Sequence, residues 1–468
     1  MADAVQNHEA PATPDARLDR ADWLSFAATA LLTFTGYILT LAPSITLGWD
    51  GILTAGAMYG GVGPPQGYPV WTIYSWLFIH LLPFGNPGWR VAVGDAVAGA
   101  LACGFVALIV SRSGKILFER MPAFERLAPH EQPLIRGISG YAAAMALGFS
   151  DDLWYQALVP NFWTMSVLLF VLVLFLLTRW WETGRKKFCW LAFFVYGLLL
   201  TNSQEMIVAL PGIVGAILLK ERNLGRDVAL VVLPVATLVT SVTQFTVRSW
   251  FSPEWDIPLF AALATPFLVA LALAIITRRI GAEWKSALAC TFLLLLGLTP
   301  YLYLPIVSAT DPPVNWAYSR TLEGFLHLIA RGQFEHPHPV TSLTVFAGEV
   351  WNLIKQTCEV FGWLYIPFAI LPFCLLHRMT TAGRKWISAL LLISFFVGPL
   401  LAGLLNISST DSQSQGLLEQ YFYILRVPIA LWIGFGLILI AAKAASFKLP
   451  ANFAPRGGDK PRLSEPLV

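Results

Sequence analysis

The sequence predicts an all-α polytopic membrane protein, because its apolar residues form long runs and its charges are few and clustered. Of the 468 residues, 56% are hydrophobic and 13% are charged, whereas a soluble domain carries about 25% charged residues. Many of the apolar runs approach the roughly 20 residues that a membrane-spanning helix needs. We therefore expect a bundle of about 12 transmembrane helices, with interfacial helices in the first loop between spans.

The predicted spans are apolar runs bounded at both ends by polar or charged residues. They lie at residues 23–43, 90–111, 136–150, 163–178, 188–202, 206–219, 228–248, 259–277, 286–305, 346–374, 386–406 and 419–442.

The basic residues predict the orientation, since cytosolic loops carry an excess of Lys and Arg. Such residues gather in alternate loops, for example at Arg185, Lys186 and Lys187, and again in the C-terminal tail. If these loops are cytosolic, both termini are cytosolic. We expect a bacterial inner membrane protein, or an endoplasmic-reticulum protein if the source is eukaryotic.

Three parts are expected along the chain. They are a cytosolic N-terminal tail over residues 1–22, a transmembrane domain over 23–443, and a cytosolic disordered tail over 444–468. The transmembrane domain includes two long non-cytosolic loops, 44–89 and 306–345, which are rich in Trp, Tyr, Pro and Gly. That composition favours ordered segments at the membrane surface, and residues 68–82 predict an interfacial helix there.

Several classes of function are disfavoured by what the sequence lacks. It contains no GxGxxG, P-loop, GxSxG or HExxH pattern, and its five cysteines lie in apolar segments without metal-ligand spacing. A net charge of +3 is too small to indicate nucleic-acid binding. We expect no cofactor and no metal site, and one divalent cation near Asp50 stays an open alternative.

A single acid, Asp50, follows the first apolar run beside Trp49. A carboxylate at the edge of a membrane helix is costly unless it has partners or a function. The plain alternative is that Asp50 caps a helix over 52–60. Residues 63–69, Gly-Pro-Pro-Gln-Gly-Tyr-Pro, are either a simple connector or a rigid wall that positions Asp50.

Three arginines, Arg90, Arg331 and Arg426, lie near the predicted non-cytosolic ends of helices. A guanidinium binds phosphate through paired hydrogen bonds, so each is a candidate phosphate ligand. Arg90 could instead form a structural ion pair with Asp95. Arg331 falls within residues 321–334, which also fit an amphipathic helix lying on the membrane.

Polar residues also interrupt the later apolar runs. A turn accounts for Asn202 and Ser203, but it does not account for Glu205 beside an apolar run. Together with the first loop, these segments supply the candidate binding residues Gln66, Tyr68, Asn202, Gln204, Glu205, Asn315 and Trp316. The tract His336-Pro337-His338 is interpreted as a loop in preference to a metal site.

These segments together resemble the protein O-mannosyltransferase-like membrane family, which belongs to the GT-C superfamily of lipid-donor glycosyltransferases. The matching residues are Leu41-Ala42-Pro43, Trp49-Asp50, Pro64-Pro65, Gly67-Tyr68-Pro69, Leu81-Leu82-Pro83-Phe84-Gly85-Asn86, Trp89-Arg90, Gly197-Leu198-Leu199-Leu200-Thr201-Asn202, Pro300-Tyr301-Leu302-Tyr303-Leu304-Pro305, Asn315-Trp316 and Arg320-Thr321-Leu322-Glu323-Gly324-Phe325. The chain departs from the family pattern at three places. The Glu of a Ser-Gly-Glu run is missing and Ile52-Leu53 stand there, Gly63 stands in place of a His before Pro-Pro, and Ser203-Gln204-Glu205 replace a His-containing run.

The resemblance implies a GT-C-like bundle that moves a hexose, mannose-like, from a polyprenyl-phosphate sugar to a hydroxyl of a protein, glycan or lipid acceptor. Transfer would occur on the non-cytosolic face with inversion, and Asp50 would act as general base. Arg90, Arg331 and Arg426 would bind the donor phosphate. The sugar or the acceptor would be contacted by the candidate binding residues Gln66, Tyr68, Asn202, Gln204, Glu205, Asn315 and Trp316. The bilayer is then a partner and nucleic acid is not. Two alternatives stay open: a lipid or sugar transporter, which would show polar residues at mid-membrane and repeated halves, and a catalytically inactive binding relative.

Overall fold

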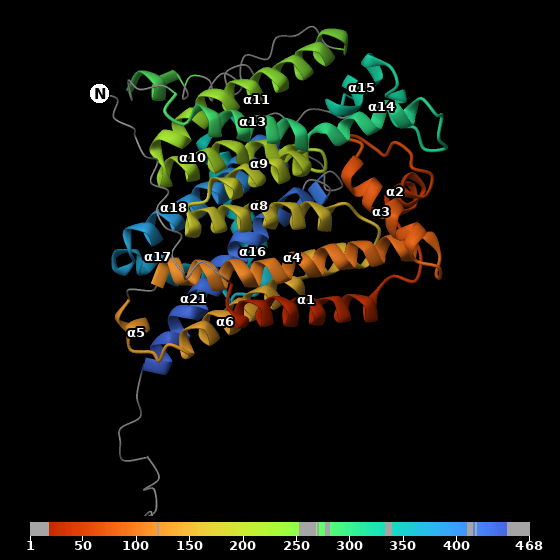
Figure 1. Ribbon diagram of the computed structural model, residues 1–468. Coiled ribbons are helices and arrows are strands. Elements are labelled where there is room, and N and C mark those ends of the chain that lie inside the picture. The colour runs from red at the N-terminus through yellow and green to blue at the C-terminus, as the bar shows by residue number, and fades with distance from the viewer. Residues whose placement is uncertain are drawn as a thin grey trace, which may run out of the picture.

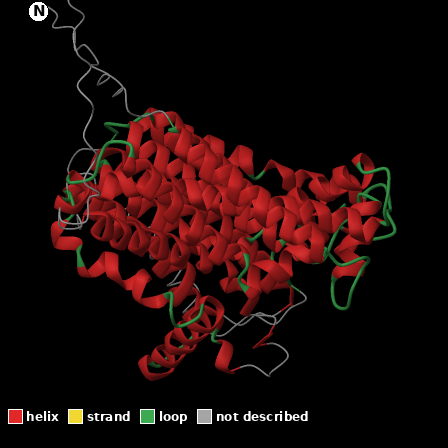
Figure 2. Ribbon diagram, turned by 90° about the horizontal axis from the view of Figure 1, so that it is seen from below, coloured by secondary structure: helices red, strands yellow, loops and turns green. Residues whose placement is uncertain are grey.

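The computed structural model is built from helices, and it describes residues 18–118, 121–251, 268, 271–276, 281–332, 339–409, 415–416 and 419–446. The elements of the described residues are all helical, with one isolated β-bridge between Val62 and Asn315. Figure 2 shows that helices make up most of the described residues, with loops gathered at the ends of the bundle. The all-α prediction is confirmed.

Six helical segments of the described chain are long and apolar enough to cross a membrane. Three are single helices: α1 (Arg20–Thr40), α4 (Pro87–Phe118) and α8 (Trp163–Thr183). The other three are runs of consecutive elements. Trp284–Ser308 contains α13 (Trp284–Gly297), η3 (Thr299–Leu302) and α14 (Tyr303–Ser308); Thr381–Leu405 contains α18 (Thr381–Phe395), η6 (Phe396–Leu400) and α19 (Leu401–Leu405); and Gln420–Ser446 contains η8 (Gln420–Leu425) and α21 (Arg426–Ser446). A seventh would be α16 (Leu343–Phe361) with α17 (Ile366–Cys374), which are bent by 117° to each other.

Shorter or less apolar helices occupy most of the other predicted spans. These are α6 (Glu131–Gly148), α9 (Lys186–Leu200), α10 (Leu210–Lys220) and α11 (Arg222–Phe251). The predicted span 259–277 lies mostly outside the described residues, so the count of about twelve stays a prediction. The remaining short elements are α5 (Pro122–Glu125), α7 (Asp151–Leu158), η2 (Gln204–Ala209), η5 (Leu376–Arg378) and η7 (Ile407–Ser409).

The bundle is organised around α4, which packs against α1, α6 and α8 (Figure 1). The apolar window of α4 is 83% buried, whereas that of α1 is 22% buried. In a membrane, α4 is therefore central, and α1 presents most of its apolar surface to the surrounding lipid.

A buried charged cluster joins three helices at the end of the bundle that the sequence predicts to be cytosolic. Arg112 of α4 donates hydrogen bonds to Asp22 of α1, at 2.9 Å, and to Glu182 of α8. Ser111 donates a further hydrogen bond of 2.6 Å to the same aspartate. Because Arg112 and Asp22 are fully buried, each charge depends on the other for compensation.

The opposite end of the bundle carries short helices from both long loops, visible together at the right of Figure 1. They are α2 (Asp50–Met58), α3 (Pro69–Leu81), α14, η4 (Trp316–Tyr318) and α15 (Leu322–Ile329). The predicted helix over 68–82 is confirmed as α3. The helix predicted over 321–334 is wrong in its length: α15 ends at Ile329, because Arg331 adopts a left-handed φ of 55° that a helix does not accommodate.

Two glycines allow α9 and α13 to touch backbone to backbone. A Cβ added at Gly197 would lie 2.3 Å from the carbonyl oxygen of Leu294 and 2.8 Å from the Cα of Gly297. Gly348, on α16, has open space around the same position. Small residues at such crossings let membrane helices approach closely.

We predict that Gly197→Ala lowers the free energy of unfolding by about 1–3 kcal/mol, because the new methyl group forces the two helices apart. Gly348→Ala, the matched control, should leave stability unchanged or slightly raised. Thermal unfolding of the purified proteins in one detergent, followed by size-exclusion chromatography, measures both. Equal melting temperatures for the two variants would show that this crossing is not tightly packed.

Candidate functional site

The first long loop is held to the turn after α9 by the side chain of Gln66. Its Nε2 donates a hydrogen bond of 3.3 Å to the carbonyl oxygen of Asn202, and its Oε1 accepts one of 2.7 Å from the backbone N–H of Gln204. Gln66 is 2% exposed. The turn that follows it reverses the chain through Gly67 and Tyr68, both at positive φ, and Pro69 then begins α3 at a position that suits proline.

A second attachment joins this loop to the later long loop. The backbone N–H of Val62 donates to the carbonyl oxygen of Val314 at 2.8 Å, and the N–H of Trp316 donates to the carbonyl oxygen of Val62 at 3.2 Å. The amide side chain of Asn315 exchanges hydrogen bonds with Ser308, so it holds its own loop. The ring of Trp316 lies 6.3 Å from that of Trp49, next to Asp50.

Tyr68 lies in an aromatic cluster at this end of the bundle. Its ring stacks on Phe162 with 3.8 Å between centroids, and its hydroxyl donates to the carbonyl oxygen of Pro65 at 2.9 Å. Gln204 donates a hydrogen bond of 2.9 Å to the hydroxyl of Tyr301. The cluster therefore combines side chains from the first loop, the start of α8, η2 and η3.

Arg331 and Glu205 face this cluster. The guanidinium of Arg331 lies 5.6 Å from the centre of the Tyr421 ring and interacts electrostatically with Tyr68 and Glu205. Both carboxylate oxygens of Glu205 are buried, and no hydrogen bond of acceptable geometry reaches them from the described residues. Burial raises the pKa of Glu205, and the positive charge of Arg331 opposes that change.

Asp50 is fixed by Thr46. The backbone N–H of Thr46 donates to Oδ2 of Asp50 at 3.3 Å, and the threonine hydroxyl donates to the same oxygen. Asp50 is the first residue of α2 and is 4% exposed. The capping interpretation is wrong, because the residue at the cap is Trp49 and the side chain of Asp50 binds residue 46, which precedes the helix.

Asp95 of α4 lies close enough to Asp50 to interact with it electrostatically. It accepts hydrogen bonds from Trp71 at 2.9 Å, from the backbone N–H of Asn161 at 2.9 Å and from Thr164 at 3.3 Å. These three donors compensate its burial and tie α3 and the start of α8 to α4.

Arg90 binds backbone carbonyl groups. Its guanidinium donates to Ile79 at 2.7 Å, to Phe84 at 3.0 Å and to Gly85 at 3.1 Å. It thereby satisfies carbonyls at the end of α3 and in the following turn. The alternative of an ion pair between Arg90 and Asp95 is wrong, since both side chains bind other groups.

Arg426 is buried and paired. Its guanidinium donates to Asp152 of α7 at 2.8 Å and to the hydroxyl of Thr357 on α16 at 2.6 Å. Only 4% of the residue is exposed. This arginine joins α7, α16 and α21.

Asn202 is also a structural anchor. It is fully buried, and its Nδ2 donates to the carbonyl oxygen of Phe162 at 3.1 Å and to the hydroxyl of Ser166 at 2.7 Å. The turn that carries Gln204 and Glu205 is thus fixed to the start of α8.

The structure thus brings together five of the candidates: Gln66, Tyr68, Gln204, Glu205 and Arg331. It places Arg90 and Arg426 elsewhere, each against protein partners. Sequence reasoning missed Tyr301, Tyr421 and Phe162 as members of the cluster. Tyr301 lies in the quoted Pro300–Pro305 motif, and Tyr421 lies in the aromatic run before the last span, so both carried a usable signal.

Metal binding finds no support in the described part of the chain, where no group of three or more His, Cys, Asp or Glu side chains is placed to hold an ion. The tract His336-Pro337-His338 lies outside the described residues.

Comparison with known proteins gives a family for part of the chain. Residues 52–225 match the family model described as the Protein O-mannosyl-transferase TMEM260 N-terminal domain. Over this segment, which is less than half of the chain, the sequence is similar to an O-mannosyl-transferase family. The match begins two residues after Asp50, and it includes Gln66, Tyr68, Gln204 and Glu205 but not Arg331.

Two curated relatives carry the same name. "Protein O-mannosyl-transferase TMEM260" of Mus musculus is 28% identical over 195 residues, which are 40% of this chain and 25% of the mouse protein. "Protein O-mannosyl-transferase tmem260" of Dictyostelium discoideum is 32% identical over 76 residues, 16% of this chain and 9% of that protein. The aligned regions therefore span a quarter or less of these relatives.

We predict that Gln66→Met lowers the free energy of unfolding by about 1–3 kcal/mol, because two buried backbone groups lose their partner. Gln132→Met is the matched control: Gln132 is half-buried and donates one hydrogen bond, to the carbonyl oxygen of Phe124. It should cost less than about 1 kcal/mol. Thermal unfolding in detergent compares the two. Equal destabilisation by the two substitutions would show that the hydrogen bonds of Gln66 contribute no more to stability than the single bond of Gln132.

Proposed function

We propose that this chain is a membrane glycosyltransferase that moves a hexose from a polyprenyl-phosphate donor to a hydroxyl group of a polypeptide. Transfer takes place at the end of the bundle that carries α2, α3 and α15, the predicted non-cytosolic side. The observation that carries the proposal is the Asp50 carboxylate, held through one oxygen at the same end as the cluster of Arg331, Glu205 and tyrosines. The names of the two relatives support a sugar transfer to protein.

Asp50 acts as the general base. Both hydrogen bonds from Thr46 go to Oδ2, and no hydrogen bond from the described residues goes to Oδ1. Oδ1 takes the proton of the acceptor hydroxyl as that oxygen attacks the anomeric carbon. The bond between the anomeric carbon and the phosphate oxygen breaks in the same displacement, so polyprenyl phosphate leaves and the anomeric configuration inverts.

Arg331 holds the phosphate of the donor. Its guanidinium is oriented by the ring of Tyr421, and a cation at this position stabilises the charge that develops on the leaving group. Arg90 and Arg426, the other two candidates, already donate to carbonyls and to Asp152 respectively. We assign those two to the fold. We assign the phosphate to Arg331 because its guanidinium lies with Tyr68, Glu205 and Tyr421 in the candidate site.

The sugar lies between Arg331 and Asp50. Gln204 and Glu205 supply polar groups for its hydroxyls, and Trp49 and Trp316 supply ring faces that suit an apolar sugar face. Glu205, whose buried oxygens accept no hydrogen bond from the described residues, would gain partners from a bound sugar.

A transporter is disfavoured by where the buried charges of the described residues lie. Asp22, Arg112 and Glu182 form a closed cluster at one end of the bundle, and Asp50, Glu205 and Arg331 lie toward the other. A transport path needs polar groups near mid-membrane.

We predict that Asp50→Asn lowers the rate of sugar transfer by about 10²–10⁴-fold, because the amide cannot accept the proton from the acceptor. The assay uses membranes supplied with a polyprenyl-phosphate hexose and a Ser- or Thr-containing peptide. Asp311→Asn is the control, since Asp311 is exposed and pairs only with Arg320 among the described residues. Transfer by Asp50→Asn at the control's rate would remove Asp50 as the base.

We predict that Arg331→Gln lowers kcat/KM for the lipid donor by about 10- to 100-fold, the loss expected when hydrogen bonds to a charged group are removed. KM for the acceptor peptide should change little. Arg320→Gln, an exposed arginine of the same loop, is the matched control. An effect on acceptor KM alone would contradict the assignment of the phosphate to Arg331.

A further inference from the structure

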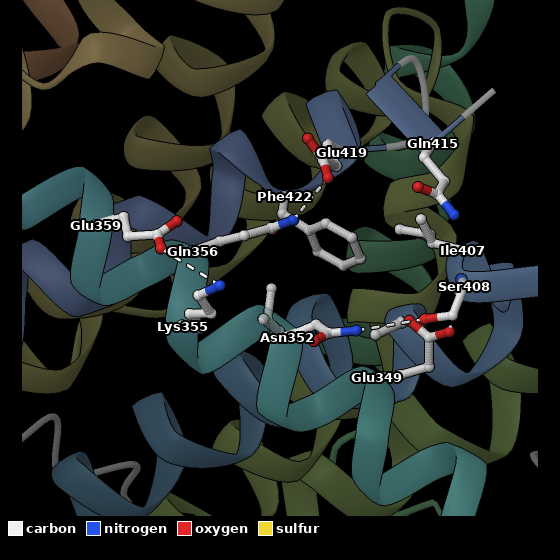
Figure 3. Close-up of a pocket in the computed structure, with 12 residues that line it drawn as sticks. Glu349, Asn352, Lys355, Gln356, Glu359, Ile407, Ser408, Gln415, Glu419 and Phe422 are labelled. Carbon is white, nitrogen blue, oxygen red and sulfur yellow. Dashed lines mark hydrogen bonds and ion pairs between the residues drawn. The ribbon is translucent and has the colours of Figure 1, made fainter. Parts of the chain in front are cut away.

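A polar pocket lies beside the candidate site, between α16, the η7 turn after α19 and the start of η8 (Figure 3). Its volume is about 380 Å³. It is formed by one face of α16 together with residues from the segment that joins the last two spans. Neither the proposed chemistry nor the family match uses it, since its lining begins at Glu349.

The lining of this pocket is dominated by hydrogen-bond acceptors and negative charge. Three carboxylates, Glu349, Glu359 and Glu419, face one ammonium group, that of Lys355. Neutral polar groups, one aromatic ring and three aliphatic side chains complete the wall: Asn352, Gln356, Ser408, Gln415, Phe422, Leu353, Ala402 and Ile407. A ligand that supplies N–H donors and positive charge is therefore complementary to it, whereas a phosphate is repelled.

Internal hydrogen bonds hold these groups in place. Glu349 is 4% exposed, and its Oε1 accepts a hydrogen bond of 2.8 Å from the backbone N–H of Ser408. Gln356 donates to Glu419 at 2.8 Å, which ties α16 to the start of η8. The ion pair of Lys355 with Glu359 is long, at 3.8 Å, and both side chains are exposed, so it is readily exchanged for another cation.

The pocket is next to the candidate site because the two share a short helix. In η8, Phe422 lines the pocket, while the preceding residue, Tyr421, contacts Arg331. Consecutive residues of a helix point in different directions, so the pocket and the Arg331 cluster lie on two faces of η8. A polypeptide bound in the pocket would thus be close to the donor phosphate.

We infer that this pocket binds a basic side chain, Lys or Arg, of the polypeptide that accepts the sugar. The inference rests on the proposed function, because it assigns the acceptor subsite of that reaction. The protein would then favour hydroxyl groups that have a basic residue nearby in the same polypeptide. A metal ion is not the occupant, since the carboxylates of the described residues do not converge as a metal-binding group.

Direct binding tests the inference without any sugar donor. Fluorescent Ser-containing peptides, identical except that a Lys is replaced by Gln or Glu at successive distances from the Ser, are titrated onto the purified full chain. At least one Lys peptide should bind more tightly than its Gln and Glu counterparts. Glu359→Gln and Glu419→Gln should each weaken that binding by about two- to five-fold, the range expected for a partly exposed charge pair.

The matched control is Glu323→Gln, an exposed acid on α15 outside the pocket, which should not change the affinity. Equal binding of the Lys, Gln and Glu peptides, or equal effects of all three substitutions, would overturn the inference. Binding is measured without donor, so a chain that binds Lys peptides through the pocket but never transfers sugar would contradict the proposed function alone.

A lipid ammonium group is the competing source of the same chemistry. The titrations are therefore repeated in nanodiscs of phosphatidylglycerol alone and with phosphatidylethanolamine added. Unchanged peptide affinity in the two lipids supports the inference. If phosphatidylethanolamine displaces the peptide from the unmodified chain but not from Glu419→Gln, the pocket is a lipid site and the inference is wrong.

Discussion

The side chain of Gln66 joins two segments that are far apart in the sequence, because its amide forms hydrogen bonds with backbone groups of the other segment. One end of its amide accepts from the N–H of Gln204 and the other donates to the carbonyl of Asn202. Without it, two backbone groups would be buried with no partner, which costs free energy that packing cannot recover. The position of Tyr68 relative to Glu205 depends on this side chain together with the backbone pairing of Val62 and the stacking of Tyr68 on Phe162.

The three candidate arginines, Arg90, Arg331 and Arg426, differ in the kind of group that each contacts. The guanidinium of Arg90 donates hydrogen bonds to backbone carbonyl oxygens, and that of Arg426 donates to a carboxylate. Both arginines therefore hold parts of the fold together. Arg331 meets the face of an aromatic ring and a tyrosine-rich surface. An aromatic face orients a guanidinium while still allowing it to bind an anion in the plane of its N–H groups. The three arginines look alike in the sequence, and only their surroundings separate them.

The sequence was sufficient for the features that depend on local composition. The membrane location, the helix α3 and the family resemblance of the first loop all follow from short runs of residues. The sequence was insufficient where the hydrogen-bond partners of a residue lie far from it along the chain. Asp95 sits one helical turn after Arg90, which suggested an ion pair, yet its donors come from Trp71, Asn161 and Thr164. The pocket beside η8 was likewise invisible, because α16 and Glu419 meet only through the fold.

The buried contact of Arg112 with Asp22 and Glu182 has a consequence for how the chain is made. Asp22 precedes Arg112 by 90 residues, and Glu182 follows it by 70. During synthesis, Asp22 is therefore made well before Arg112, and their buried ion pair can form only once α4 is present. The packing of α1 against α4 at this end of the bundle is therefore completed only after both later segments have been made, and the three-helix cluster closes last at α8.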